Sequence, residues 1–167
     1  MAKVLVVYGS KMGGTAEIAS WITDAVGSAG HVATCLEADQ VREVGGYDAV
    51  IAGSSLYAGR WRRPVVAVLK KVARLSPSPP VWLFHSGPLG EEHVPEDQPI
   101  PGSVESVAAK LDIRGIVTFG GRLPTDPPGW IASKMAQGDM AGDWRDEAAV
   151  RAWGDQIAKD LRIGAGV

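Results

Sequence analysis

Glycine and hydroxyl-bearing residues follow directly after the first hydrophobic run of the chain. Residues 3–8 form a near-continuous β-branched run that is typical of a buried strand, and a helical pattern begins at Thr15. A strand that turns into a helix presents free backbone N–H groups at the positive end of the helix dipole, which favours phosphate binding. The residues that would form this cradle are Ser10, Lys11, Met12, Gly13, Gly14 and Thr15.

The spacing of this turn excludes two common phosphate motifs. A P-loop requires Lys-Ser or Lys-Thr after its last glycine, whereas Gly14 is followed by Thr15 and Ala16. The dinucleotide fingerprint G-x-G-x-x-G does not fit Gly9, Gly13 and Gly14 either. A hydroxyl-rich loop of this length suits a terminal monophosphate, as in a mononucleotide flavin. An ordinary turn with Thr15 near the helix N-cap is the alternative.

Length and composition predict a single globular domain over residues 1–167, because 46% of the residues are hydrophobic. The formal net charge of −2 gives no case for nucleic-acid binding. No apolar run approaches the roughly 18 residues of a membrane span. We therefore expect a protein that is not integral to a membrane and, without a signal-peptide pattern, a cytoplasmic location. We expect the single cysteine, Cys35, to be a core residue rather than a reactive thiol.

Strand-like and helix-like segments alternate along the chain. Strands are predicted at residues 3–8, 31–36, 48–53, 81–85 and 113–120. Helices are predicted at residues 15–27, 64–75, 103–111 and 148–161, with loops at 87–102 and 124–129. This alternation implies an α/β fold with a five-stranded parallel sheet covered on both faces. A phosphate loop after the first strand favours the strand order 2-1-3-4-5.

In this strand order, the segments after strands one, three, four and five should converge on one site. All four are rich in Gly and Ser, and their exposed peptide groups can hydrogen-bond the heteroatoms of a planar ring. Tyr57 and Trp61 can add a flat aromatic face. Arg122 lies in the segment after strand five, close to the ring or its tail. His85, at the end of strand four, is predicted to be a packed or capping histidine.

Residues 8–19, residues 47–57 with Gly59, and the closing helix at 153–161 resemble the flavodoxin family. The resemblance covers essentially the whole chain and is closest to the branch that includes the menaquinone-dependent protoporphyrinogen dehydrogenases. It implies a flavodoxin-like three-layer sandwich that binds FMN, with residues 10–15 around the ribityl phosphate. The residues that would flank the isoalloxazine ring are Ser54, Ser55, Leu56, Tyr57, Ser86, Gly87, Pro88, Leu89 and Gly90. A backbone N–H or C=O group within residues 54–59, which include Ala58 and Gly59, or within residues 86–90 would face the N5 edge of the ring.

Several functions remain open. The favoured hypothesis is an FMN-binding electron carrier or small quinone-linked oxidoreductase, whose partner is a redox protein or a quinone. A deazaflavin is the alternative cofactor, because Arg60, Arg62, Arg63 and Arg122 suit its anionic tail, although the first three also fit a solvated helix start. A protoporphyrinogen dehydrogenase would carry a basic insertion after strand five, where residues 124–144 hold a single lysine, Lys134. A cofactor-free interaction module is the remaining alternative.

No catalytic triad, metal-ligand cluster or carboxylate pair lies at a predicted strand end. We therefore expect no catalytic side chain and no metal, and a bound cofactor would supply the chemistry.

Overall fold

The computed structural model describes residues 1–56, 58–87, 99–124 and 142–164. A five-stranded sheet has the order β2-β1-β3-β4-β5, and every neighbouring pair is parallel. Its strands are β1 (Lys3–Gly9), β2 (Val32–Glu37), β3 (Ala49–Ser55), β4 (Pro80–Ser86) and β5 (Asp112–Phe119). The predicted fold class and strand order are confirmed.

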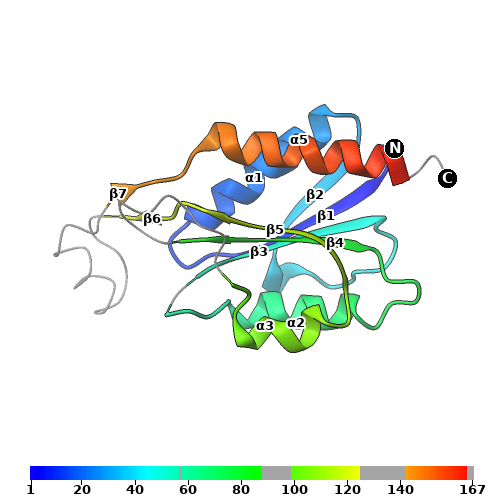
Figure 1. Ribbon diagram of the computed structural model, residues 1–167, viewed down its shortest axis with the longest axis horizontal. Coiled ribbons are helices and arrows are strands. Elements are labelled where there is room, and N and C mark those ends of the chain that lie inside the picture. Colours follow the sequence, from blue (N-terminus) through cyan, green and yellow to red (C-terminus); the bar gives the residue numbers. More distant parts are fainter. Residues whose placement is uncertain (57, 88–98, 125–141, 165–167) are drawn as a thin grey trace.

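Helices cover both faces of the sheet and produce the predicted three-layer sandwich (Figure 1). One face packs against α1 (Gly14–Ser28) and α5 (Glu147–Gly164). The other face packs against α2 (Arg63–Val72) and α3 (Gly102–Ala108). A short antiparallel pair, β6 (Arg122–Leu123) and β7 (Gly142–Asp143), lies at one end of the sheet, opposite the end where the N-terminus and the last turn of α5 lie.

The central strand β1 shows why its sequence is almost continuously hydrophobic. Val4 and Val6 belong to the core on the α1 and α5 face, whereas Leu5 and Val7 belong to the core on the α2 and α3 face. All four side chains are completely buried. Full burial of such a side chain contributes about 1.5–3 kcal/mol, so β1 anchors both layers at once.

The helices α1 and α2 each bury one apolar face whose side chains recur at helical spacing. Ile18 and Ile22 of α1 pack into the same core as Ile157 of α5. Pro64 occupies the first turn of α2, where the missing N–H is tolerated, and Val65 and Leu69 face the sheet. The 3.6-residue spacing of apolar residues in the sequence therefore predicted the positions of these two helices correctly.

Element boundaries differ from the predicted ones in several places. β3 continues to Ser55 rather than ending at Gly53, because its ladder with β4 extends to the pair Ser55 and Ser86. α2 ends at Val72 and α3 at Ala108, each earlier than predicted, and α5 continues to Gly164. The 3-10 turn Ala38–Gln40 and the strands β6 and β7 were not predicted, because such short elements carry no hydrophobic period.

Cys35 lies half-buried on β2, where it packs against the core on the α1 face. Burial raises the pKa of its thiol above the ordinary value of 9.0. Because the thiolate is the reactive form, we expect Cys35 to be alkylated by iodoacetamide at pH 8 several-fold more slowly in the native protein than in urea. Alkylation rates from mass spectrometry would check this, and equal rates would contradict it.

Candidate functional site

The segments that follow β1, β3, β4 and β5 meet at the carboxyl edge of the sheet, as predicted. The N–H of Leu56, after β3, donates to the C=O of Ser86 at 2.9 Å. The N–H of Gly87, after β4, donates to the C=O of Phe119 at 3.1 Å. The hydroxyls of Thr15 and Ser86 lie 2.8 Å apart. Four loops distant in sequence thus form one continuous edge.

The loop before α1 has the geometry of an open anion cradle. Gly13 is the N-cap of α1, has a φ of 85°, and makes no side-chain cap. Its N–H donates to Ser10 Oγ at 2.9 Å, which fixes the turn. The first N–H groups of α1, at Gly14, Thr15 and Ala16, have no acceptor within a regular helix. A Cβ added at Gly13 would meet nothing within 4 Å and Gly13 is exposed, so the space beside this N-cap residue is open.

Gly14 has a different role from the one expected. Gly13 has a positive φ, whereas Gly14 does not. A Cβ on Gly14 would lie 3.2 Å from Cβ of Arg122. Gly14 therefore allows β6 to pack closely against the start of α1.

The Thr15 side chain lies buried at the start of α1, beneath the cradle. Thr15 is 2% exposed and Ser86 is 7% exposed, and their hydroxyls share a hydrogen bond. This bond ties the start of α1 to the end of β4. Lys11 and Met12 are partly buried beside it.

The two serines at the end of β3 are placed differently. Ser54 is completely buried; its Oγ accepts the N–H of Arg62 at 2.8 Å, and its hydroxyl donates to the C=O of Ser55 at 3.0 Å. Ser54 therefore fixes the start of α2. Ser55 Oγ is also buried, and among the described residues it has no hydrogen-bond partner. A buried hydroxyl without a partner costs about 1–3 kcal/mol, so a ligand group at this position would relieve a real penalty.

Left-handed backbone follows β3. Ala58 has a φ of 51° and Gly59 a φ of 70°. The conformation costs a residue with a Cβ roughly 1–2 kcal/mol, and such strain concentrates at binding sites. Gly87 also has a positive φ, of 128°. Four predicted site residues lie outside the described residues: Tyr57, Pro88, Leu89 and Gly90.

A buried hydrogen-bonded chain lies beneath this edge. The indole N–H of Trp61 donates to Nδ1 of His85 at 3.3 Å, so the other ring nitrogen carries the proton. That nitrogen, Nε2, lies 2.8 Å from Thr118 Oγ1 and donates to it. His85 is completely buried, which confirms the predicted packed histidine. Trp61 is 5% exposed, so the expectation that it offers a flat face to a ligand is wrong.

Arg145, which the sequence did not point to, ties the far side of the cradle together. Its side chain is 5% exposed and forms ion pairs of 2.6 Å with both Asp143 and Glu17. It also donates to the C=O of Gly14 at 3.3 Å and lies 5.1 Å from the ring centre of Trp21. Its hydrogen bonds hold the pKa of the Asp143 carboxyl below the ordinary value. Arg145 thereby links β7 to the first turn of α1.

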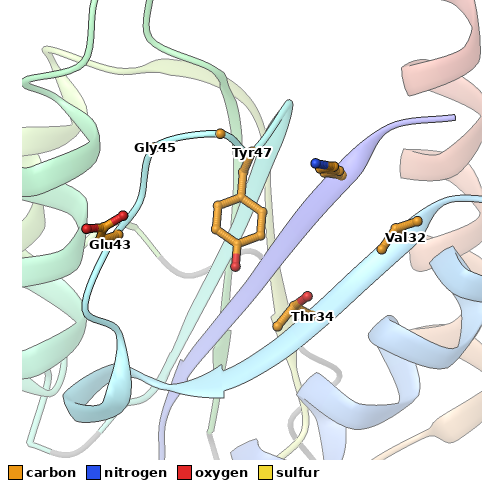
Figure 2. Close-up of a pocket in the computed structure, with 7 residues that line it drawn as sticks. Val32, Thr34, Glu43, Gly45 and Tyr47 are labelled. Carbon is orange, nitrogen blue, oxygen red and sulfur yellow. The ribbon is translucent and has the colours of Figure 1, made fainter.

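Two hollows lie away from this edge. One, of about 410 Å³, lies beside β2, and the side chain of Tyr47 points over it between Glu43 and Thr34 (Figure 2). The other, of about 980 Å³, lies at the amino ends of the strands and includes Met1 and Gly164 in its lining. The residues that line them include none of the predicted site residues.

Two further searches concern only the parts of the chain that the structure describes. Within these parts, no helix combines the length and the apolar content that crossing a bilayer requires. The same residues contain no group of three or more His, Cys, Asp or Glu side chains arranged to hold a metal ion.

A family model described as a flavodoxin domain matches residues 5–137. A flavodoxin from the domain Archaea is similar in structure, with a TM-score of 0.63, 16% identity, and coverage of 96% of this chain and 99% of that one. A mutant flavodoxin from Pseudomonas aeruginosa gives a TM-score of 0.65 at 16% identity, covering 96% and 99%.

The rubredoxin oxygen:oxidoreductase of Desulfovibrio gigas is also similar, with a TM-score of 0.66 at 14% identity. The match covers 99% of this chain but 37% of that larger one. No curated protein matches the sequence.

Proposed function

Because this chain belongs to the flavodoxin-domain family, we propose that it binds FMN at the carboxyl edge of its sheet and transfers electrons. It acts as an electron carrier or as a small quinone-linked oxidoreductase. The observation that carries this proposal is the open cradle at Gly13, where α1 begins without a side-chain cap and a Cβ would meet nothing within 4 Å. A phosphate is the group that such a helix start favours.

The residues at this edge fit the rest of the cofactor. The ribityl phosphate would lie against residues 10–15, and the ring between the segments after β3 and β4. Ser55 Oγ supplies a buried polar atom that still lacks a partner among the described residues. A bound flavin supplies the redox chemistry, and the chain binds and orients it. A tenfold difference in affinity between two redox states shifts a one-electron potential by about 59 mV.

Ser55→Ala tests this fit without disturbing the cradle. We expect the free energy of unfolding of the cofactor-free protein to stay the same or rise by up to ~1 kcal/mol, because an unpaired buried hydroxyl is removed. We expect FMN affinity to fall about fivefold, because the bound cofactor loses a hydrogen bond. Urea unfolding and a fluorescence titration measure the two effects. A clear loss of stability with unchanged affinity would mean that the hydroxyl serves the fold.

A deazaflavin is the second candidate cofactor, and exposed arginines at the same edge favour it. Arg60, Arg62, Arg63 and Arg122 are all exposed, and a deazaflavin with an anionic tail would use that charge. The reaction would then be hydride transfer rather than electron transfer. The partner we propose for the FMN form is a redox protein or a quinone.

Protoporphyrinogen oxidation rests on the family resemblance alone, since residues 125–141 lie outside the described residues. It requires that the FMN-loaded protein oxidise protoporphyrinogen in the presence of a quinone. A module without a cofactor is the remaining alternative, and the intact cradle argues against it.

An absorbance titration of cofactor-stripped protein with FMN and, in parallel, with a deazaflavin tests the proposal. Saturable FMN binding with a perturbed visible band supports the flavin assignment. Selective binding of the deazaflavin would keep the site and change the chemistry. Binding of neither cofactor would favour the hypothesis of a cofactor-free interaction module.

A further inference from the structure

We infer that Arg62 and Arg122 form a clamp that recognises the phosphate of the cofactor as a dianion, one arginine on each side of the cradle. The inference rests on the proposed function and adds to it a second binding arginine, Arg62, and the charge state of the bound group.

Arg62 is anchored against the first residue of the loop. A Cβ on Gly9 would lie 2.8 Å from Cβ and 3.0 Å from Cγ of Arg62, so the stem of this arginine covers the end of β1. The backbone of Arg62 is fixed as well, because its N–H donates to the buried Ser54 Oγ. The first two carbons of the side chain thus have a defined position beside the loop.

Arg122 is anchored against the other end of the loop. Its Cβ lies 3.2 Å, and its backbone N 3.7 Å, from the position of a Cβ on Gly14. Arg122 belongs to β6, which is held in register by β7. The two arginines therefore bracket the loop at Gly9 and Gly14, with the open cradle at Gly13 between these positions in the chain.

The described acidic side chains compensate the charge of Arg122 only in part, through Asp143, whose carboxyl pKa is lowered mainly by hydrogen bonds from Arg145 and to a lesser extent by the charge of Arg122. Asp143 is the cross-strand partner of Arg122, but both of its carboxylate oxygens accept hydrogen bonds from Arg145, at 2.7 and 2.6 Å. Among the described residues, no ion pair involves Arg62 or Arg122. The first turn of α2 also lacks an acidic residue, so Arg62 adds its charge to the positive end of that helix.

An anion bound beside the loop would interact favourably with both arginines. A cation at the positive end of a helix is unfavourable and two like charges anchored at one loop repel each other, so a bound anion offsets both effects. A phosphomonoester carries nearly two negative charges at pH 7, since its second pKa is about 6, and it matches two arginines. A phosphodiester carries one negative charge and would compensate only one of the two arginine charges.

The test compares FMN with riboflavin, which lacks the phosphate, on wild-type protein and on Arg62→Gln and Arg122→Gln. Glutamine keeps part of the apolar stem that packs on the loop. Arg74→Gln is the matched control, because Arg74 is an exposed arginine beyond the opposite end of α2. We expect each clamp variant to weaken FMN by about tenfold or more and to leave riboflavin unchanged. We expect Arg74→Gln to alter FMN affinity by less than about threefold at 0.15 M salt.

The pH dependence gives a readout that a purely structural role would not produce. Wild-type affinity for FMN should fall as the pH drops from 7.5 to 5.5, because the phosphate takes up a proton, and the double clamp variant should show a smaller fall. Equal losses for FMN and riboflavin, no loss of FMN affinity, or a loss in Arg74→Gln as large as in the clamp variants would each overturn the clamp. Wild-type protein that binds a phosphodiester deazaflavin but not FMN would overturn recognition of a dianion. Wild-type protein that binds no flavin at all would instead overturn the proposed function, and the clamp with it.

Discussion

Gly13→Val should reduce FMN affinity by at least 100-fold, about 3 kcal/mol, while the protein still folds cooperatively. Valine would fill the space beside Gly13 that a Cβ now finds empty, and that space is where we place the phosphate. The positive φ of 85° is also unfavourable for a β-branched residue, so the free energy of unfolding should drop by about 1–2 kcal/mol. Isothermal titration calorimetry and urea unfolding measure the two effects.

Gly30→Val separates backbone strain from loss of the site. Gly30 has a φ of 94°, also faces open space, and lies beyond the opposite end of α1. We expect a similar loss of stability and unchanged FMN affinity. If Gly13→Val binds FMN as wild type does, residues 10–15 do not hold the phosphate. If both variants lose binding, the effect of Gly13→Val is a general effect of strain.

Arg145→Ala should lower the free energy of unfolding by about 2–3 kcal/mol. The buried guanidinium pairs with Asp143 and Glu17 and binds the C=O of Gly14, and all three lose this partner together. Breaking a buried ion pair costs about 3–5 kcal/mol, and the expected value is smaller because both carboxylates are roughly half-exposed. Chemical unfolding with tryptophan fluorescence as the signal measures the loss.

Arg151→Ala is the matched control for Arg145→Ala. Arg151 also pairs with two carboxylates, those of Glu147 and Asp24, but its side chain is 40% exposed. Solvent-exposed ion pairs contribute little, so we expect stability close to that of wild type. Equal losses in the two variants would show that burial of Arg145 adds nothing. No loss in Arg145→Ala would show that β7 is held to α1 by other contacts.

The sequence allowed prediction of the sheet order and the cradle because both have local signals. The hydrophobic run of β1, the Gly/Ser turn and the helical period of α1 are contiguous, and parallel crossovers restrict the topology. The convergence of the segments around Thr15, Leu56 and Ser86 followed from that topology. Their side-chain hydrogen bonds did not follow from it, because they depend on packing.

What the sequence did not reveal depends on contacts between distant residues. Glu17 and Arg145 are 128 residues apart, and no short pattern marks their ion pair. The close approach of Arg122 to Gly14 requires the β6 and β7 pair, whose strands are too short to carry a period. Trp61 resembles a ligand-stacking residue in sequence, but its indole N–H bonds to the buried His85 instead. In each case a contact that forms only in the folded chain decided the role of the residue.

The most direct test of the central claim is an NMR titration of isotope-labelled, cofactor-stripped protein with FMN, followed through its backbone amides. We expect the largest shifts at Gly13, Gly14 and Thr15, with further shifts at Ser55, Leu56 and Gly87. Largest shifts at residues 43–47 beside β2, or at the N-terminus and the end of α5, would place the ligand in one of the two other hollows and contradict it.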